Sequence, residues 1–401
     1  MPDKPNPAQA ARERESQRIG GEVVRLLDNL LQRATDARAS DLHIEPKEHM
    51  IRVRFRVDGV MVEQRPLPTS YAAPLLSRIK VVAQMDIAEK RIPQDGTFTF
   101  TTKDQEHIAV RASTFPSVHG EKAVLRLMHG GQVMSLTELG VATDQELALR
   151  RMAWRPGGLV VVTGPTGSGK TSTLYALLEE VDAVRRNVVT LEDPIEVPLP
   201  NITQGQINPK AGFTWARGLR AVLRQDPDVI LVGEMRDTET AQTAVQASLT
   251  GHLVLSTIHT NSSVETMIRL IDMGMEPYIV SNALIGVVAQ RLVRTLCPFC
   301  AVPGPPYEED LEDLGFDIGE LSGSKRAVGC PECMGTGFLG RTGIFDVVPV
   351  DDDLRTVLKR SGQVREIKMV LKEKGLPTLR RAGVDLVAAG TTTLGEVIRV
   401  T

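Results

Sequence analysis

Apolar and polar positions follow one rhythm before about residue 130 of this chain and another rhythm after it. Residues 19–34 carry apolar side chains at helical spacing, which predicts an amphipathic helix behind a poorly ordered tail of residues 1 to about 18. This helix would either pack on its own domain or dock onto a partner subunit. In residues 50–62 apolar positions alternate with arginines up to Asp58-Gly59, which is typical of a β-hairpin.

One face of this hairpin is apolar, and the other carries Arg52, Arg54 and Arg56. A row of arginines is most often a solvated sheet face, and the alternative is a face that meets phosphate or an acidic neighbour. Further strands are predicted at 97–101, 107–113 and 123–128 and a helix at 72–84, so that residues 39–130 would form a small α+β domain.

After a polar segment, residues 131–145, which we interpret as a linker, strands and helices alternate. Such alternation predicts a parallel sheet with helices on both faces, and ligand chemistry at the carboxyl ends of its strands. The predicted strands are 159–162, 187–191, 228–232 and 253–256, and the predicted helices are 172–181, 215–224 and 238–249.

Composition narrows the class of protein. The 401 residues include 47 Lys and Arg against 50 Asp and Glu, so no overall field attracts the chain to nucleic acid or to an anionic membrane. No apolar run approaches the ~18 residues that span a bilayer, and the N-terminus lacks the apolar core of a signal peptide. The sequence therefore predicts a cytoplasmic protein of two or three domains.

A glycine-rich stretch follows the predicted strand 159–162 and fits the phosphate-loop pattern G-x-x-x-x-G-K-[ST]. Its glycines let backbone N–H groups surround a polyphosphate, and the helix that follows adds its positive end. Lys170 would reach the β- and γ-phosphates of ATP, and the Thr171 hydroxyl would hold Mg²⁺. The alternative is a turn that binds nothing. The candidate nucleotide-binding residues are Gly164, Pro165, Thr166, Gly167, Ser168, Gly169, Lys170, Thr171 and Ser172.

Polar residues follow or flank each later strand of the predicted sheet. Glu234 comes after strand 228–232, where an ATPase needs a carboxylate to orient water, and Glu192 and Glu196 form a second acidic group. His252 and His259 flank strand 253–256, so that one or both could sense the γ-phosphate. The alternative for each is a surface charge or an ordinary loop histidine.

Arginines are a further set of candidates, because a guanidinium can offset the charge that develops on a transferred phosphoryl group. Arg220 and Arg224 lie one helical turn apart in the predicted helix 215–224 and share a face. Arg111 and Arg126 lie in predicted strands of the N-terminal domain. From the residues alone, ordinary surface arginines are the alternative.

At this point the sequence resembles a known family, the secretion NTPases of type II secretion and type IV pilus assembly, the GspE/PilB family. Its N-terminal motif, Walker A, aspartate box, Walker B and histidine box have counterparts here in the same order. Further matches extend the resemblance over residues 39–401. The stretches that carry it are 39–46, 164–175, 192–196, 223–237 with Gly233-Glu234, 250–260, 87–91 and 289–292.

The resemblance implies a PAS-like domain over residues 39–130, joined flexibly to a RecA-like ATPase domain over residues 146–401, and assembly as a hexamer on the cytoplasmic face of the inner membrane. It implies that Arg111 and Arg126 reach the nucleotide, that Glu234 is the catalytic or water-orienting acid, and that Glu192 and Glu196 lie near Mg²⁺. It makes His252 and His259 the sensors.

The sequence departs from common patterns at two points. Gly233 stands where many Walker B motifs have an aspartate, so that residue cannot position Mg²⁺ directly. Larger members of the family carry an additional N-terminal domain that binds a membrane-anchored partner. Only about 38 residues precede the first motif here.

The four cysteines form two Cys-x-x-C pairs, Cys297 with Cys300 and Cys330 with Cys333. Two such knuckles can close a tetrahedral four-cysteine site, and zinc is the metal expected in a reducing cytosol. Because such a site leaves no position for water, we interpret it as structural. A zinc-ribbon nucleic-acid module and a redox pair are less favoured alternatives. Family members that assemble filaments commonly carry this tetracysteine element, unlike the pilus-retraction branch.

We therefore expect a hexameric ATPase, with ATP, Mg²⁺ and Zn²⁺ as cofactors, that powers assembly of pilin or pseudopilin subunits. Its partners would be an inner-membrane platform protein and other secretion or pilus components, with no nucleic acid. A nucleotide-dependent scaffold and a DNA-uptake or conjugation-type ATPase are the alternatives. A strongly basic channel would favour the DNA-translocating alternative, and the near-neutral composition offers none.

Overall fold

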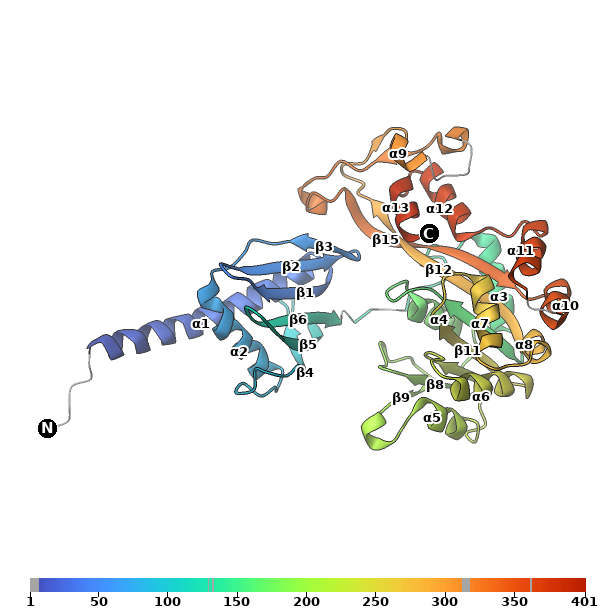
Figure 1. The fold of residues 1–401 in the computed structure, drawn as a ribbon, viewed down its shortest axis with the longest axis horizontal. Helices are drawn as coiled ribbons and strands as arrows, with labels where there is room; N and C mark the ends of the chain where they lie inside the picture. Colours follow the sequence, from blue (N-terminus) through green and yellow to red (C-terminus); the bar gives the residue numbers. More distant parts are fainter. Residues whose placement is uncertain (1–6, 129, 132, 312–317, 361–362) are drawn as a thin grey trace. The chain divides into compact units, whose positions relative to one another are not determined.

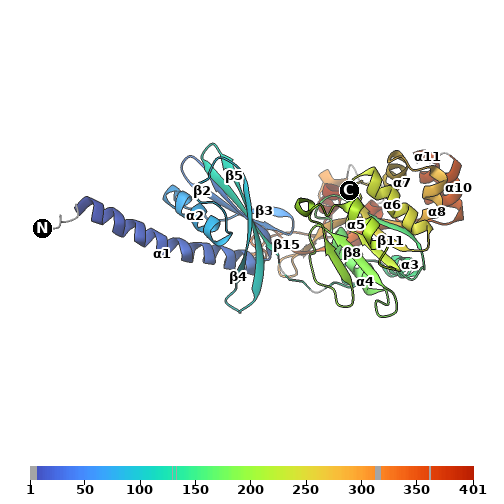
Figure 2. The same ribbon diagram turned by 90° about the horizontal axis from the view of Figure 1, so that it is seen from below.

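In a computed structural model the chain folds as two compact units, residues 1–131 and residues 132–401. The structure describes residues 7–128, 130–131, 133–311, 318–360 and 363–401. Within these ranges, no helix is both long enough and apolar enough to cross a membrane. Figures 1 and 2 give two views of the ribbon.

The first unit is a six-stranded antiparallel sheet with the strand order β3-β2-β1-β6-β5-β4. The α+β prediction is confirmed, and the helices α1 and α2 contribute side chains to the same core as the apolar face of the sheet. The sequence pattern did not predict the strand β1, which lies inside the sheet between β2 and β6. The elements are α1 (Pro7–Asp36), β1 (Ala39–Pro46), β2 (Ile51–Val57), β3 (Val60–Glu63), α2 (Ala72–Val82), β4 (Gln94–Thr101), β5 (His107–Ser117) and β6 (Gly120–Met128).

The prediction of a poorly ordered tail up to about residue 18 is wrong for residues 7–18, because α1 begins at Pro7; residues 1–6 lie outside the described part of the chain. Proline is tolerated at the first position of a helix, and the following Ala, Gln, Arg and Glu are strong helix formers. Farther along, Val23, Leu27, Leu30 and Leu31 are buried in the core. This part of the helix therefore packs on its own domain.

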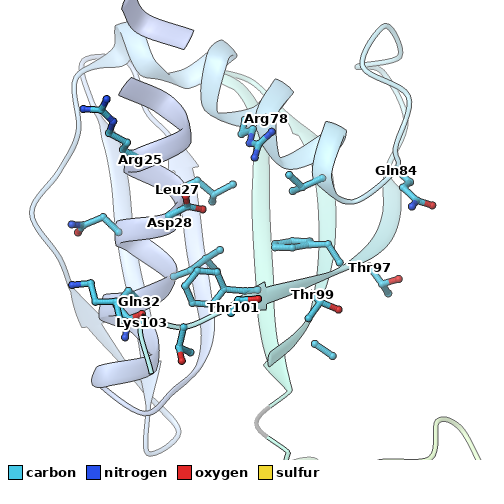
Figure 3. Close-up of a pocket in the computed structure, with 17 residues that line it drawn as sticks. Arg25, Leu27, Asp28, Gln32, Arg78, Gln84, Thr97, Thr99, Thr101 and Lys103 are labelled. Atoms are coloured by element: carbon cyan, nitrogen blue, oxygen red, sulfur yellow. Dashed lines mark hydrogen bonds between the residues drawn. The ribbon is translucent and has the colours of Figure 1, made fainter. Parts of the chain in front are cut away.

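A groove in the first unit lies between α1, α2 and β4, which is the last strand of the sheet (Figure 3). Its volume is about 990 Å³. Apolar side chains of Leu27, Phe98 and Phe100 contribute to its wall, and Arg78 and Lys103 line it as well. None of the candidate site residues lines this groove.

The second unit is built on a seven-stranded sheet with the order β15-β12-β7-β11-β10-β8-β9. All neighbouring strands are parallel except the edge strand β15, which is antiparallel to β12. The predicted parallel sheet is confirmed. Its strands are β7 (Gly158–Thr163), β8 (Val188–Glu192), β9 (Thr203–Gln206), β10 (Val229–Val232), β11 (Leu253–Ile258), β12 (Leu284–Leu296) and β15 (Phe338–Pro349).

Two separate cores cover the two faces of this sheet. One contains side chains of α3 (Thr143–Ala153) and α4 (Lys170–Glu179), and also Leu136 and Leu139 from the segment interpreted as a linker. The other contains side chains of a larger group of helices. That group is α5 (Trp215–Val222), α6 (Thr238–Leu249), α7 (Ser263–Asp272), α8 (Pro277–Ala283), α10 (Asp352–Arg360) and α11 (Val364–Glu373).

Beyond the sheet, β12 and β15 continue as a two-stranded ribbon whose end carries the cysteines. Helices α12 (Leu379–Ala388) and α13 (Leu394–Val400) pack against this ribbon in a smaller core with Val293 and Ile344. The short strands β13 (Val302–Pro303) and β14 (Lys325–Arg326) pair with each other, and α9 (Glu308–Leu311) lies in the same excursion between the cysteine pairs.

Candidate functional site

The phosphate loop connects the buried strand β7 to helix α4, as the motif predicts. Gly164, Gly167 and Gly169 have φ values of 149°, 80° and 87°, a region that favours glycine. Lys170 is the first residue of α4, and its Nζ donates to the carbonyl oxygens of Gly164 (2.8 Å) and Pro165 (2.9 Å). The Lys170 side chain therefore folds back over the phosphate loop.

Two observations bear on whether the loop fits a polyphosphate. Ser168 is only 3% exposed, and its buried hydroxyl has no hydrogen-bond partner. Burial lowers the pKa of Lys170, and the nearby carboxylate of Glu234 offsets only part of this shift. A half-buried cation, an unpaired hydroxyl and the amino end of a helix form a donor set suited to an anion. The residues present therefore fit a bound phosphate.

Three strand ends meet beside this loop. Thr163 ends β7, and its hydroxyl lies 2.7 Å from the Thr260 hydroxyl, beyond the end of β11. Glu234 follows β10, where the backbone of Met235 donates to Thr257 at 2.9 Å. This network joins the ends of β7, β11 and β10 at the carboxyl edge of the sheet, where doubly wound folds bind ligands.

Glu234 is held from two sides at this edge. Its Oε1 lies 2.6 Å from Arg236 Nη2, and its Oε2 lies 3.4 Å from His259 Nε2. The carboxylate is 13% exposed, whereas His259 is 50% exposed. Glu234 therefore keeps partial access to solvent while its orientation is fixed, which suits a group that must orient water.

Glu192 lies at the end of β8 in a closed hydrogen-bond network. It is 3% exposed, and it accepts hydrogen bonds from the hydroxyl groups of Tyr175 and Thr190 and from Gln204 Nε2. Burial, followed by the hydrogen bond to Glu192, raises the pKa of Tyr175. Glu196, four residues on, is exposed, and its backbone N–H lies 3.4 Å from the Tyr175 hydroxyl.

Tyr175 and Gln204 were not recognised from the sequence. Tyr175 looks like one more apolar position of α4, and Gln204 lies 12 residues beyond its acidic partner. The alternation of strands and helices predicts that β8 ends near the phosphate loop, but it does not predict which side chains donate hydrogen bonds to the Glu192 carboxylate.

The structure does not bring His252 to this edge. His252 precedes β11, and its backbone carbonyl accepts from Gly158, at the start of β7. Because β7 and β11 are parallel, His252 lies at the amino edge of the sheet. The phosphate loop follows β7 at the carboxyl edge. His252 Nδ1 instead lies 2.9 Å from the carbonyl oxygen of Ala247. Of the two histidines, only His259 lies beside Glu234.

Arg220 and Arg224 have partners other than Glu234 within this chain. Arg220 pairs with Glu239 of α6, and Arg224 Nη1 donates to the Arg220 carbonyl at 2.7 Å. The residues after Arg224 are held by Asn187, just before β8, which places this connection at the amino edge of the sheet.

Gly233 occupies the Walker B position that often carries an aspartate. A Cβ atom built there would lie 3.1 Å from Trp215 Cη2 and 3.2 Å from the Leu191 carbonyl oxygen. Both distances are tighter than ordinary contact. Glycine at this position therefore leaves room for Trp215 of α5 and for the Leu191 carbonyl of β8, which both lie close to it.

In the first unit, the arginine row of the hairpin meets acidic neighbours. Arg54 Nη2 lies 2.7 Å from Glu45, and Arg52 pairs with Glu63. Burial alone would raise the pKa of Glu45, but its hydrogen bonds to Arg54 and Lys122 lower it to about 2. The arginine row therefore faces acidic neighbours, which is one of the alternatives that the sequence left open.

Asp41 holds Arg126 on the same face of this sheet. Arg126 Nε donates to Asp41 Oδ1 at 2.8 Å, and the two side chains are 64% and 4% exposed. Arg111 stands opposite Arg126 in the register of β5 and β6, and it is also exposed. Both arginines are therefore available to a ligand outside the sheet.

The four cysteine sulfurs converge, with all four atoms within 4.8 Å of one another. The pairs Cys297–Cys330, Cys300–Cys333 and Cys330–Cys333 have Sγ–Sγ distances of 3.8, 3.9 and 3.7 Å. Corners of a tetrahedron with metal–sulfur bonds of ~2.3 Å are about 3.8 Å apart. The cluster therefore has the dimensions of a site for one metal ion.

Backbone N–H groups support the same interpretation. The N–H groups of Cys330 and Gly337 point at Cys333 Sγ, at 3.1 and 3.2 Å, and that of Gly329 points at Cys300 Sγ at 3.3 Å. Burial opposes a charged sulfur at Cys333, but these two N–H groups, with the side chains of Cys330 and Cys300, lower its pKa to about 6, whereas burial raises the pKa of Cys300 to about 11. Donors aimed at sulfur favour thiolates, the form that binds a metal.

Comparison with known proteins shows the family of this chain. The family model for "Type II/IV secretion system protein" matches residues 16–399. The chain belongs to this family. The "Type II secretion system protein E" of Pectobacterium carotovorum subsp. carotovorum is 50% identical over 380 residues, which cover 94% of this chain and 76% of that protein. The "Type II secretion system ATPase E" of Vibrio cholerae serotype O1 is 47% identical over 388 residues, covering 94% and 75%.

Solved structures share the fold of this secretion family member. The ATPase DotB of Legionella pneumophila has a TM-score of 0.69 at 20% identity and covers 94% of this chain and 95% of its own. The pilus retraction motor PilT with bound ADP has a TM-score of 0.61 at 23% identity and covers 93% and 96%. The RecA-like architecture is thus confirmed, and the family and its relatives identify the chain as a secretion ATPase.

Proposed function

We propose that this secretion ATPase is a hexameric motor on the cytoplasmic face of the inner membrane, where ATP hydrolysis drives assembly of pseudopilin or pilin subunits. The relatives named as type II secretion proteins favour the pseudopilins of that system. The observation that carries the proposal is the meeting of the phosphate loop with Glu234 at one edge of the sheet, where hydrogen bonds between Thr163 and Thr260 and between Met235 and Thr257 join the strand ends.

Each residue at this edge has a role in hydrolysis. Lys170 and the N–H groups of the loop bind the phosphates of ATP. When bound, Mg²⁺ would neutralise charge on those phosphates, and Thr171 is the residue that would hold it. Glu234 orients the attacking water and accepts its proton at a carboxylate oxygen, and His259 and Arg236 fix the carboxylate.

Other candidates take supporting roles. Glu192 sits in its closed network with Tyr175 and Gln204, and it holds the end of β8 next to β10, whereas Glu196 remains open to solvent. Arg111 and Arg126 supply positive charge to the nucleotide across a domain or subunit seam, with Asp41 holding Arg126. Arg220 and Arg224 act from a neighbouring subunit, because within their own chain their guanidinium groups are engaged by Glu239 and by the Arg220 carbonyl oxygen.

The four cysteines bind Zn²⁺ as a structural ion. Their spacing fits tetrahedral thiolate ligation, and four protein ligands leave no position for water. Partners would be an inner-membrane platform protein and other secretion components, through which the motor associates with the membrane.

The test is ATP turnover measured as a function of protein concentration, with the oligomer mass followed by light scattering, for the wild type and Arg126→Ala. Turnover per chain should rise as hexamers form and should collapse in the variant. Asp41→Asn, which removes the charge that pairs with Arg126, should give an intermediate loss. Turnover that is independent of both assembly and Arg126 would instead favour a self-sufficient nucleotide switch.

A further inference from the structure

Strand β12 runs past the end of its neighbour β7, and its next residue lies against the phosphate loop. The two strands pair up to Thr163 and Ala289, where β7 gives way to the loop. Gln290 therefore comes level with the loop itself. It is 1% exposed, and it belongs to none of the catalytic or phosphate-binding groups described above.

Gln290 contacts both ends of the phosphate loop. Its Nε2 donates to the carbonyl oxygen of Ser168 at 2.7 Å. A Cβ atom built on Gly164 would lie 2.6 Å from the Gln290 carbonyl oxygen, and one built on Gly169 would lie 3.2 Å from Gln290 Nε2. One buried residue thus borders the first glycine of the loop and the last.

The neighbouring Arg291 anchors this arrangement from the other side. It is 7% exposed, and its guanidinium donates to three backbone carbonyls, those of Gln290 (2.9 Å), Asn261 (2.9 Å) and Val400 (3.0 Å). Asn261 lies two residues beyond His259, and Val400 ends α13. The carbonyl that faces Gly164 is therefore itself fixed by a charged donor.

The direction of the Gln290 hydrogen bond has a consequence for the loop. In a trans peptide unit the C=O and the N–H point in opposite directions. Because Gln290 holds the Ser168 carbonyl toward β12, the N–H of Gly169 in the same peptide unit points away from β12. That N–H is one of the loop donors at the amino end of α4, where an anion would bind.

We propose that Gln290 is a positioning residue for phosphate binding, which aims the Gly169 N–H by holding the Ser168 carbonyl, with Arg291 as its anchor. This inference rests on the proposed nucleotide site. A preorganised donor stabilises an anion without the cost of reorienting a peptide unit at the moment of binding. A purely structural hydrogen bond would stabilise the fold without affecting the affinity for nucleotide.

The chain offers a matched control for this distinction. Gln145 is also buried, and its Nε2 donates to a backbone carbonyl, that of Phe345 on β15, at 3.1 Å. Gln145→Met and Gln290→Met therefore remove the same kind of hydrogen bond within one unit. Both should lower the Tm, but only Gln290→Met should weaken ADP binding, by about tenfold or more.

The experiment is calorimetric titration of ADP into the wild type and the two methionine variants, together with Gln290→Glu from pH 5.5 to 8.5. A protonated glutamic acid can still donate to Ser168, whereas its carboxylate cannot, so the affinity of Gln290→Glu should fall with rising pH relative to wild type. Gln290→Met should show no such additional pH dependence.

Three outcomes are distinguished. If the wild type binds no ADP, the nucleotide site itself is wrong. If the wild type binds and Gln290→Met binds within twofold of it while its Tm falls as in Gln145→Met, the positioning role is overturned. Should Gln290→Met not fold, the pH series of Gln290→Glu decides alone, and a flat ratio to wild type overturns the proposal.

Discussion

His259 Nε2 lies 3.4 Å from Glu234 Oε2, although the two residues follow different strands and are separated by the whole of α6 and β11. The pair forms because β10 and β11 are parallel neighbours whose ends coincide at one edge of the sheet. The imidazole thus faces the carboxylate oxygen that Arg236 does not hold. A cation or hydrogen-bond donor on each oxygen limits the rotation of the carboxylate.

Glu234→Gln should preserve nucleotide binding and remove turnover, because the amide keeps the shape of the side chain but accepts a proton poorly. We expect kcat to fall at least 100-fold, the lower end of general-base contributions, with a Kd for ATP within about threefold of wild type. Steady-state turnover and equilibrium titration measure the two quantities. Glu276→Gln, on an exposed residue before α8, is the control, and normal turnover by Glu234→Gln would remove Glu234 from this role.

Lys170→Ala should abolish nucleotide binding while leaving the unit folded. The ammonium is the charged donor of the loop, and its present hydrogen bonds go only to two loop carbonyls. Fluorescence titration with a labelled ADP and a thermal melt measure the two effects. Lys210→Ala, on an exposed lysine outside the loop, should bind as wild type does, and binding by Lys170→Ala at wild-type strength would contradict the assignment.

Cys330→Ser should lower stability before it changes nucleotide affinity, because a closed four-cysteine site acts through folding. Zinc content per chain should fall from about one toward zero, and the Tm should fall with it. Both tryptophans, Trp154 and Trp215, lie in the second unit, so tryptophan fluorescence follows the unfolding of that unit alone. Zero zinc in wild-type protein purified without chelator would exclude the metal site.

Glu396 should make the second unit sensitive to acid. It is 3% exposed, and although burial raises its pKa, Arg294 and Arg399 lower it to about 2 from an ordinary 4.5. A carboxylate whose pKa is lower in the folded state stabilises fully above pH 4.5, and this contribution is lost as the pH falls toward 2.

Glu396→Gln should therefore cost on the order of 3 kcal/mol in the free energy of unfolding at pH 7 and much less near pH 2. Denaturant titrations followed by tryptophan fluorescence give both values. Glu373→Gln, on an exposed residue of α11, should change neither. An equal cost of Glu396→Gln at both pH values would show that the ion pairs are not its cause.

Some of this structure was predictable because its signals are local. The phosphate loop, Glu234 and the two cysteine pairs are each defined within a few residues, and the alternation of strands and helices places the first two at one sheet edge. The position of His252 was also available in principle. A residue before a parallel strand lies at the amino edge, and the prediction treated both ends of β11 alike.

Other features depend on contacts that no local pattern reveals. Gln290 donates to Ser168, 122 residues earlier, and in the sequence it is one of four polar residues in β12, with Arg291, Arg294 and Thr295. Helix α1 begins at Pro7 in a stretch without apolar periodicity, where helix propensity alone carries the information. Asp41 lies in β1, a strand that the apolar pattern did not predict, and its partner Arg126 is 85 residues away.

The close approach of Trp215 to Gly233 limits which pairs of residues can occupy these two positions. An aspartate at 233 would require the indole of Trp215 to move away from its Cβ atom. The Leu191 carbonyl also lies close to that Cβ position, and it belongs to the buried strand β8, whose backbone moves less easily than a side chain. Relatives that carry a side chain at 233 should therefore have a smaller residue at 215. The two positions are expected to covary, and replacing glycine alone would cost stability that the paired change would restore.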